Sequence, residues 1–563
     1  MIALLYVQSD GSMLVETEHP AYDQVRHTLA AIAALVQRME PLYVYQIRPF
    51  TLWQAAALGY TAREVLGFLR KFSANPVPYA LQQLIVSEMG KWGRLILQRG
   101  ARNRIALRAD RPVLEALRAR GEVSQMAAEV QDDALVFHAR DRAKVKQVLA
   151  KLGFPVIDRA GYRTAPSVEV ELSPDTTLRP YQREAVHRFF THTAEESGVV
   201  VLPCGAGKTL VGIAVLAQLK MQALILTPSF SSAAQWRNEL LHRTSLTESN
   251  VCIYEPGQPP APITITTYQR VTSKARSGDM PHLTALTQCP WGIVIYDEVH
   301  MLPAPLFRLA ADLQSSRRLG LTATLVREDG AETDVFSLIG PKCFEVPWRQ
   351  LEQEGYLSTV RCVQVEIALP ESARAAYAAA TARDKHRIAA LNEDKLDVVE
   401  ALCRRHHGES ILIIGHYLES LERAARRVGC PLVTGRTPES ERLAVFDQFR
   451  RREIRCIALS RVANMAVDLP VASVGIQISG LFGSRQEEAQ RLGRLLRPAS
   501  AEGTFYSLVS KDTLEMQMAK RRQLYLVEQG YSYEIIDSAE VTWYLPNTER
   551  MKDCELVGVP EHR

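Results

Sequence analysis

The residues best suited to chemistry follow an apolar, β-branched stretch, in the run GVVVLPCGAGKT at 198–209. Gly205 and Gly207 would let the backbone curl so that several N–H groups point at one phosphate, whose charge Lys208 would neutralise. The hydroxyl of Thr209 would then ligate magnesium. The residues expected to bind nucleotide in this loop are Pro203, Cys204, Gly205, Ala206, Gly207, Lys208, Thr209 and Leu210.

The loop departs from the usual phosphate-binding spacing at one position. The full pattern has a glycine where this chain has Leu202. An ordinary helix-capping turn is the alternative interpretation of GAGKT. A buried strand before the loop and an apolar helix after it favour the phosphate role.

Two adjacent carboxylates end a second apolar run, WGIVIYDEVHMLPA at 291–304. Asp297 would hold the magnesium, usually through water, and Glu298 would polarise the water that attacks the γ-phosphate. One carboxylate alone at a strand end would more simply be a solvated cap. The pair, downstream of a phosphate loop, indicates an ATP-hydrolysing site with Mg²⁺ as its cofactor.

A third group of chemically capable residues lies near the C-terminus, in SRQEEAQRLGRLLRP at 484–498. Gln490, Arg494 and Arg497 are spaced by four and three, so they would share one helix face. An arginine presented in this way stabilises the charge that develops during phosphoryl transfer. A basic solvated helix face is the alternative, and the phosphate loop elsewhere in the chain favours the catalytic interpretation.

The elements around these residues repeat in a strand-then-helix rhythm. GVVVL, ALILT, ITITT and GIVIY precede helical or loop segments, and SILIIGH, IRCIALS and SVGIQIS repeat the pattern. This predicts an α/β protein with two tandem RecA-like lobes of parallel sheet, preceded by small α+β N-terminal domains. The expected ranges are 1–98 and 99–165 for the N-terminal domains, 166–350 and 351–540 for the lobes, and 541–563 for a tail.

Composition narrows the class of protein. A chain of 563 residues is too long for one hydrophobic core. With 47% hydrophobic and 23% charged residues, it is neither disordered nor fibrous. A net charge of +4 is too small to indicate a nucleic-acid partner by itself.

Cysteine usage and hydropathy predict a cytoplasmic protein without a membrane partner. The nine cysteines are scattered, as in a reducing compartment. The first apolar run is interrupted at Gln8 and Asp10, and no stretch is long enough to span a bilayer. Cys403, His406 and His407 suggest half of a metal site, but the lack of a second ligand pair favours a basic helix end.

Seven segments occur in the order of the superfamily 2 helicase motifs. They are LRPYQ at 178–182, LPCGAGKT, LTPSFSSAAQW at 226–236, TTYQR at 266–270, DEVH at 297–300, LGLTATLVRED at 319–329 and QRLGRLLRP. Within that superfamily the chain most resembles the XPB family, particularly its bacterial form. The features that carry this resemblance are DEVH, the RED tripeptide at 327–329, the N-terminal YQIRPFTLWQAAALG and the C-terminal FYSLVSKDTLEMQMAKRRQLYLVEQGYSYEII.

The resemblance implies an ATP-dependent 3′ to 5′ DNA helicase or translocase acting in DNA repair. It implies that Gln182 recognises adenine, and that 99–165 is a damage-recognition-like domain. It also implies a thumb-like insertion at about 371–392, with Arg374, Arg383, Lys385 and Arg387. Coupling and strand separation would fall to Thr322, Thr324, Arg327, Glu328, Asp329 and Asp468.

The expected partner is single-stranded or forked DNA, bound without sequence preference. The chain itself is expected to be a monomer. The resemblance also implies a separate nuclease as a protein partner. The cluster Arg99, Arg102, Arg104, Arg108 and Arg111 is either a DNA-facing patch or a solvated surface. Three alternatives remain: a double-strand translocase without productive unwinding, an RNA-directed motor, and a non-catalytic scaffold. The scaffold is disfavoured because the residues of the proposed ATP site are intact: Lys208, Thr209, Asp297, Glu298 and Arg497.

Overall fold

The structure is a computed structural model, and it divides the chain into two compact units. The first is built mainly on Met1–Leu357 and the second mainly on the residues from Ser358 onward. The residues described are 4–39, 41–101, 103–160, 165–191, 197–203, 205–275, 279–299, 313, 315–323, 335–336, 338–346, 348–357, 359–460, 472–480, 503–528 and 533–542.

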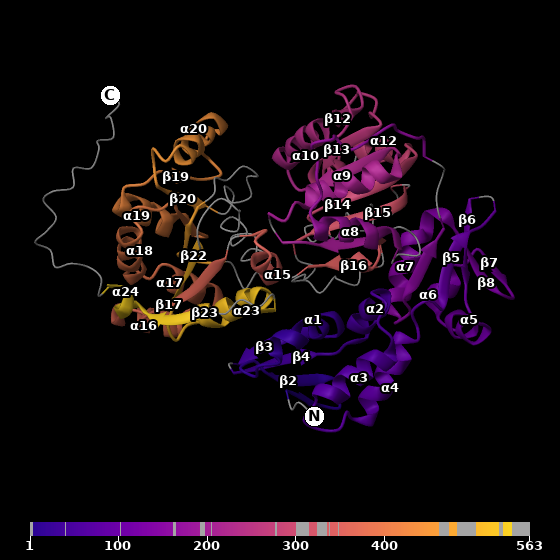
Figure 1. The fold of residues 1–563 in the computed structure, drawn as a ribbon, viewed down its shortest axis with the longest axis horizontal. Helices are drawn as coiled ribbons and strands as arrows, with labels where there is room; N and C mark the ends of the chain where they lie inside the picture. The colour runs from indigo at the N-terminus through magenta and orange to yellow at the C-terminus, as the bar shows by residue number, and fades with distance from the viewer. Residues whose placement is uncertain are drawn as a thin grey trace, which may run out of the picture. The chain divides into compact units, whose positions relative to one another are not determined.

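The first lobe is built on one sheet with helices around it (Figure 1). Its central strands are buried on both faces. Its described strands run in the order β12-β13-β11-β14-β15-β10-β16, and every pairing between them is parallel. Val200 packs into one core, whereas Val199 and Val201 pack into the other. A strand buried on both sides needs no polar face, which explains the continuous β-branched runs. The strands are β10 (Gly198–Val201), β11 (Ala223–Thr227), β12 (Val251–Ile253), β13 (Ile263–Thr267), β14 (Trp291–Asp297), β15 (Ser315–Thr322) and β16 (Lys342–Glu345).

Helices cover both faces of this sheet. One core includes Tyr181 from α8, Val211 from α9 and Trp236 from α10. The other includes Tyr268 from α11 and Leu283 from α12. The helices are α8 (Pro180–Thr191), α9 (Lys208–Leu219), α10 (Phe230–Arg243), α11 (Tyr268–Thr272), α12 (Pro281–Thr287) and α15 (Trp348–Gln353).

The second lobe repeats this architecture. Its described strands run in the order β19-β20-β18-β21-β22-β17-β23, again with parallel pairing throughout. One face packs against α18 and α19, where Leu402 and Leu421 join the core. The strands are β17 (Val360–Ile367), β18 (Ile411–Gly415), β19 (Leu432–Val433), β20 (Cys456–Ser460), β21 (Val474–Gln477), β22 (Gly503–Ser510) and β23 (Tyr533–Asp537). The helices are α16 (Glu371–Ala379), α17 (Ala382–Ala390), α18 (Asp394–Arg405), α19 (Leu418–Val428), α20 (Glu439–Arg450), α23 (Leu514–Glu528) and α24 (Ser538–Thr542).

Two smaller sheets precede the first lobe. One is antiparallel, in the order β1-β2-β4-β3, and the other is mixed, in the order β7-β8-β6-β5-β9. The elements of the first are β1 (Leu5–Val7), β2 (Ser12–Glu16), α1 (Tyr22–Ile32), β3 (Ala34–Met39), β4 (Leu42–Gln46), α2 (Pro49–Ala57), α3 (Ala62–Phe72) and α4 (Tyr79–Met89). Those of the second are β5 (Leu95–Arg99), β6 (Arg104–Arg108), α5 (Arg111–Arg118), α6 (Gly121–Met126), β7 (Glu129–Gln131), β8 (Ala134–His138), η1 (Ala139–Asp141), α7 (Arg142–Lys151) and β9 (Val156–Arg159).

The predicted fold class is confirmed, since two parallel-sheet α/β lobes follow small N-terminal α+β sheets. Among the described residues, none of the helices combines the length and the apolarity that crossing a membrane requires.

Candidate active site

The phosphate loop connects β10 to α9. Gly205 and Gly207 have φ values of +82° and +79°, which a residue with a Cβ adopts only under strain. Gly207 is the N-cap of α9, and Lys208 is its first residue. The start of α9 therefore offers backbone N–H groups to an anion.

Leu202, the departure from the usual loop pattern, has a packing role. Its side chain is fully buried in the core beneath α8 and α9. Its N–H donates to the carbonyl of Thr322 at 2.9 Å. The position therefore continues the sheet, and the backbone turns only after it.

Two side chains from the start of α8 hold the loop from outside. The Tyr181 hydroxyl and the Gln182 amide donate to the carbonyl of Ala206, at 2.8 Å and 2.9 Å. A Cβ added at Gly207 would lie 2.5 Å from Gln182 Nε2, so any larger residue would displace that amide. Gln182 therefore lies against the phosphate loop.

The acidic pair stands at the end of β14. Lys208 Nζ lies 3.1 Å from Glu298 Oε1, which joins the phosphate loop to the acidic pair by an ion pair. Glu298 has a φ of +47°, a strained backbone conformation for a residue with a side chain. Asp297 Oδ2 accepts a hydrogen bond from Trp236 Nε1 at 2.9 Å, and the Asp297 carbonyl accepts one from the Tyr268 hydroxyl at 2.7 Å.

The electrostatics at Asp297 favour a bound cation. Burial, reinforced by the adjacent Glu298 carboxylate, raises the pKa of Asp297 to about 6, although Trp236 and Lys208 oppose the rise. A positive charge beside a buried carboxylate favours its ionised form. A divalent cation bound here would therefore stabilise the Asp297 carboxylate, whose negative charge burial otherwise disfavours.

Strand order brings these groups together. β15 lies between β10 and β14, with Thr322 opposite Val201 and Leu321 opposite Asp297. Because the strands are parallel, their carboxyl ends meet at one edge. The phosphate loop, the acidic pair and Thr322 therefore share that edge of the first lobe, although they are far apart in the sequence.

Nine of the predicted site residues lie outside the described residues. They are Cys204, Thr324, Arg327, Glu328, Asp329, Asp468, Gln490, Arg494 and Arg497.

The structure adds three side chains to which the sequence assigned no role. Tyr181, Trp236 and Tyr268 each hydrogen-bond a residue of the phosphate loop or the acidic pair. All three stand inside motifs that the sequence displays, LRPYQ, LTPSFSSAAQW and TTYQR. Their aromatic character signals burial, but the atom each one contacts depends on tertiary packing.

The arginine cluster near residue 100 is largely neutralised by its neighbours. Three of its members form ion pairs with carboxylates, and Arg102 lies outside the described residues. Local pairing reduces the net positive field that a DNA-facing patch needs. The pairs are Arg104–Glu129, Arg108–Asp133 and Arg111–Glu115.

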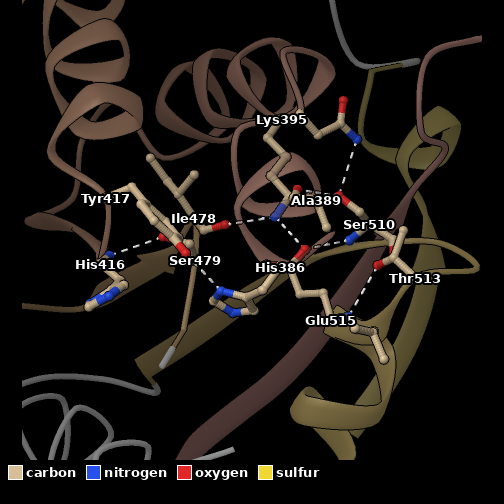
Figure 2. A network of polar contacts seen from close by, with 12 residues as sticks. His386, Ala389, Lys395, His416, Tyr417, Ile478, Ser479, Ser510, Thr513 and Glu515 are labelled. Atoms are coloured by element: carbon tan, nitrogen blue, oxygen red, sulfur yellow. Dashed lines mark hydrogen bonds and ion pairs between the residues drawn. The ribbon is translucent and has the colours of Figure 1, made fainter. Parts of the chain in front are cut away.

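In the second lobe, a buried polar network ties α17 and α18 to the carboxyl ends of β21 and β22 (Figure 2). Lys395 and Glu515 form an ion pair of 2.7 Å in which both side chains are fully buried. Lys395 also donates to the Ile478 carbonyl at 3.0 Å, and the Ser510 hydroxyl donates to the Ala389 carbonyl at 2.7 Å.

The same network reaches the helices of the range predicted to be thumb-like. His386 Nδ1 lies 2.9 Å from the Tyr417 hydroxyl, and the Leu514 N–H donates to the Tyr377 hydroxyl at 2.7 Å. These contacts fix α16 and α17 on the edge of the lobe where its strands end.

Comparisons with known proteins extend over nearly the whole chain. The model described as the ERCC3/RAD25/XPB C-terminal helicase matches residues 351–555. "Helicase conserved C-terminal domain" matches 5–132, and "Type III restriction enzyme, res subunit" matches 175–327. A protein named "DNA 3'-5' helicase XPB" from Kineococcus radiotolerans is 46% identical, covering 97% of this chain and 98% of its own.

The chain belongs to the XPB family. A second relative of that name, from Mycobacterium tuberculosis, is 44% identical, with 95% of this chain and 98% of its own covered. An XPB protein of Antonospora locustae, named as the helicase/translocase subunit of general transcription and DNA repair factor IIH, is 34% identical over 95% of this chain and 82% of its own. The XPB motifs quoted from the sequence are therefore part of an end-to-end similarity.

The donor set of this XPB-family chain suits magnesium. Thr209 and Asp297 offer a hydroxyl and a carboxylate, the hard oxygen ligands that Mg²⁺ prefers. Mg²⁺ usually keeps several waters and takes one or two protein ligands together with substrate phosphates. The residues at this strand edge fit that requirement.

Proposed function

We propose that this chain is an ATP-driven 3′ to 5′ DNA helicase or translocase of the XPB type. The observation that carries the proposal is the ion pair of 3.1 Å between Lys208 and Glu298. It unites a glycine-containing phosphate loop and an acidic pair at one strand edge. Membership of a family whose similar members are named DNA 3'-5' helicases supports DNA as the substrate.

The chemistry follows from the placement of three charged groups. Lys208 and the N-terminus of α9 bind the β- and γ-phosphates and offset their negative charge. Glu298 orients and polarises the attacking water. Asp297 and Thr209 hold Mg²⁺, which when bound supplies further charge stabilisation to the transferring phosphoryl group.

The remaining roles are assigned by motif. Gln182, held against the phosphate loop through Ala206, reads the adenine. Gln490, Arg494 and Arg497 are assigned to ATP hydrolysis, with Arg497 stabilising transition-state charge. Coupling to DNA is assigned to Thr322, Thr324, Arg327, Glu328, Asp329 and Asp468.

The proposal extends to a role in DNA repair and to the other parts of the chain. The domain at 99–165 is assigned to damage recognition and the insertion at 371–392 to a thumb-like DNA contact. Binding is mainly to backbone phosphates, so it is salt-dependent and indifferent to sequence. We further propose that the chain acts in the cytoplasm as a monomer, together with a separate nuclease.

The test measures ATP hydrolysis by the purified chain with single-stranded, duplex and forked DNA and with RNA. We expect stimulation by DNA, and strand displacement on a duplex with a 3′ tail but not on one with a 5′ tail. Lys208→Ala is the matched inactive control. Absence of hydrolysis on every polynucleotide overturns the proposal.

Two other outcomes favour the alternatives. Stimulation by RNA alone identifies an RNA-directed motor. Displacement of a triplex-forming strand without any duplex unwinding identifies a double-strand translocase.

A further inference from the structure

Trp236 contacts two elements of the candidate nucleotide site, β14 and α9. Its indole N–H donates to Asp297 Oδ2 at 2.9 Å, at the end of β14. Its ring lies against Gly212 of α9, the helix that follows the phosphate loop. The side chain is 1% exposed, so its position is set by packing and not by solvent.

Gly212 shows how closely the ring is packed. A Cβ built at Gly212 would lie 2.6 Å from Trp236 Cη2 and 3.1 Å from Leu321 Cδ1. Any larger residue there would displace the indole. The indole ring therefore fits in the space left by the missing side chain of Gly212. In this position its N–H points at the Asp297 carboxylate.

Tyr268 provides a second, independent contact to the same residue. Its hydroxyl donates to the Asp297 carbonyl at 2.7 Å. Asp297 is thus held at its side chain by α10 and at its backbone by α11.

We propose that Trp236 is a positioning residue for magnesium, which orients the Asp297 carboxylate through its indole N–H, with Tyr268 holding the backbone beneath it. The inference rests on the proposed assignment of Asp297 to Mg²⁺. A hydrogen bond to a charged acceptor is stronger and more directional than a neutral one. A carboxylate fixed in this way does not have to lose rotational freedom when the cation binds, so the cation is bound more tightly.

The chain provides a matched control for the loss of an indole N–H. Trp291 is also 1% exposed and belongs to the same lobe, but its N–H donates to the Leu286 carbonyl at 2.8 Å. Trp236→Phe and Trp291→Phe each remove one buried indole N–H bond. Only the first removes a bond to Asp297.

The experiment measures cation binding as well as turnover. Binding of Mn²⁺, a paramagnetic substitute for Mg²⁺, is followed by electron paramagnetic resonance in the presence of ADP. The Mg²⁺ concentration for half-maximal ATPase is measured at saturating DNA. We expect Trp236→Phe to weaken Mn²⁺ binding about tenfold and to raise the half-maximal Mg²⁺ concentration by a similar factor. Trp291→Phe leaves both unchanged.

A second variant covers the case in which Trp236→Phe fails to fold. β-(3-Benzothienyl)alanine at position 236 keeps the bicyclic shape but lacks the N–H. It should reproduce the weakened Mn²⁺ binding while circular dichroism stays that of the wild type. Unchanged Mn²⁺ binding in a folded variant overturns the proposal, as does equal weakening by Trp291→Phe.

Failure of this inference is distinguishable from failure of the proposed function. If wild-type ATPase is stimulated by DNA and lost in Lys208→Ala, the motor assignment stands whatever Trp236 does. If Asp297→Asn leaves Mn²⁺ binding intact, the assignment of the cation to Asp297 is wrong, and the role of Trp236 is excluded with it.

Discussion

Lys208 Nζ lies 3.1 Å from Glu298 Oε1, so the cation expected to hold phosphate is paired with the carboxylate expected to activate water. The two side chains are only 10% and 19% exposed, which makes the pair stronger than one at the surface. A γ-phosphate entering the loop would compete with Glu298 for Lys208. Nucleotide binding and release of the carboxylate are therefore linked.

This linkage predicts different effects for the two partners. Lys208→Ala should weaken ATP binding at least about tenfold, because it removes the charge that the phosphates need. Glu298→Gln should bind ATP at least as tightly as the wild type, because the charged carboxylate that competes with phosphate for Lys208 is gone. Binding of a fluorescent ATP analogue to each variant measures both effects.

Both variants should nevertheless lose DNA-stimulated ATPase by about a hundredfold or more, since positioned charge and the catalytic base supply effects of this size. Near-normal turnover by either variant would remove the active-site assignment. Weaker ATP binding by Glu298→Gln would show that the ion pair does not compete with nucleotide.

Gly207→Ala tests the conformation of the phosphate loop. The residue has a φ of +79°, and a Cβ there would lie 2.5 Å from Gln182 Nε2. The left-handed conformation costs a residue with a Cβ about 1–2 kcal/mol, before the clash is added. We expect ATPase to fall sharply together with ATP affinity.

The matched control is Gly257→Ala. Gly257 has a similar φ of +84°, but a Cβ there would meet nothing within 4 Å. It should lose some stability and keep its ATP affinity. If both variants bind ATP equally well, close approach at Gly207 is not required for the site.

The buried ion pairs of Asp158 should make the stability of the second N-terminal sheet sensitive to acid. Burial raises the pKa of its carboxyl, but attraction to Arg142 and Lys146, at 2.7 Å and 3.0 Å, more than offsets this and holds the pKa well below its usual range. Asp158→Asn would remove the buried carboxylate that pairs with both cations and should cost about 3–5 kcal/mol of stability. Hydrogen exchange of the β5 and β9 amides measures this locally.

The pH dependence follows from the lowered pKa. The contribution of the Asp158 carboxylate to stability is fully present above its unfolded-state pKa of 3.8, and it is lost as the pH falls through the lower folded-state value. The difference between wild type and Asp158→Asn should therefore be constant near neutrality and shrink below pH 3.8. Asp133→Asn, which removes an exposed pair in the same domain, serves as control. A difference that grows as the pH falls would contradict the assigned direction.

The buried pair in the second lobe predicts a large loss of stability on removal of one partner. Lys395→Met leaves Glu515 as an uncompensated charge that is 0% exposed, and this should cost about 3–5 kcal/mol. Chemical denaturation followed by circular dichroism measures the change.

Arg387→Met removes an exposed pair with Glu419, on the helix next to Lys395, and should change little. A second variant, Lys395→Met with Glu515→Leu, should regain part of the lost stability, because neither charge is then left alone. Equal stability of wild type and Lys395→Met would show that the pair is not the anchor of this network.

The sequence by itself determined the fold class and the candidate groups that carry chemistry. Continuous β-branched runs predicted strands buried on both faces, because a parallel sheet covered by helices has no solvated side. Gly205 and Gly207 predicted a loop whose backbone curls around a phosphate, since glycine adopts backbone conformations that strain other residues. These properties are local, so a short window of residues contains the information.

Tertiary structure alone decided which of these groups meet. Lys208 and Glu298 are ninety positions apart, and their ion pair exists because strand order leaves only β15 between β14 and β10. The same holds for Trp236, whose indole reaches Asp297 only because Gly212 leaves room for its ring. Contacts of this kind depend on the packing of distant segments, which no local pattern of residues specifies.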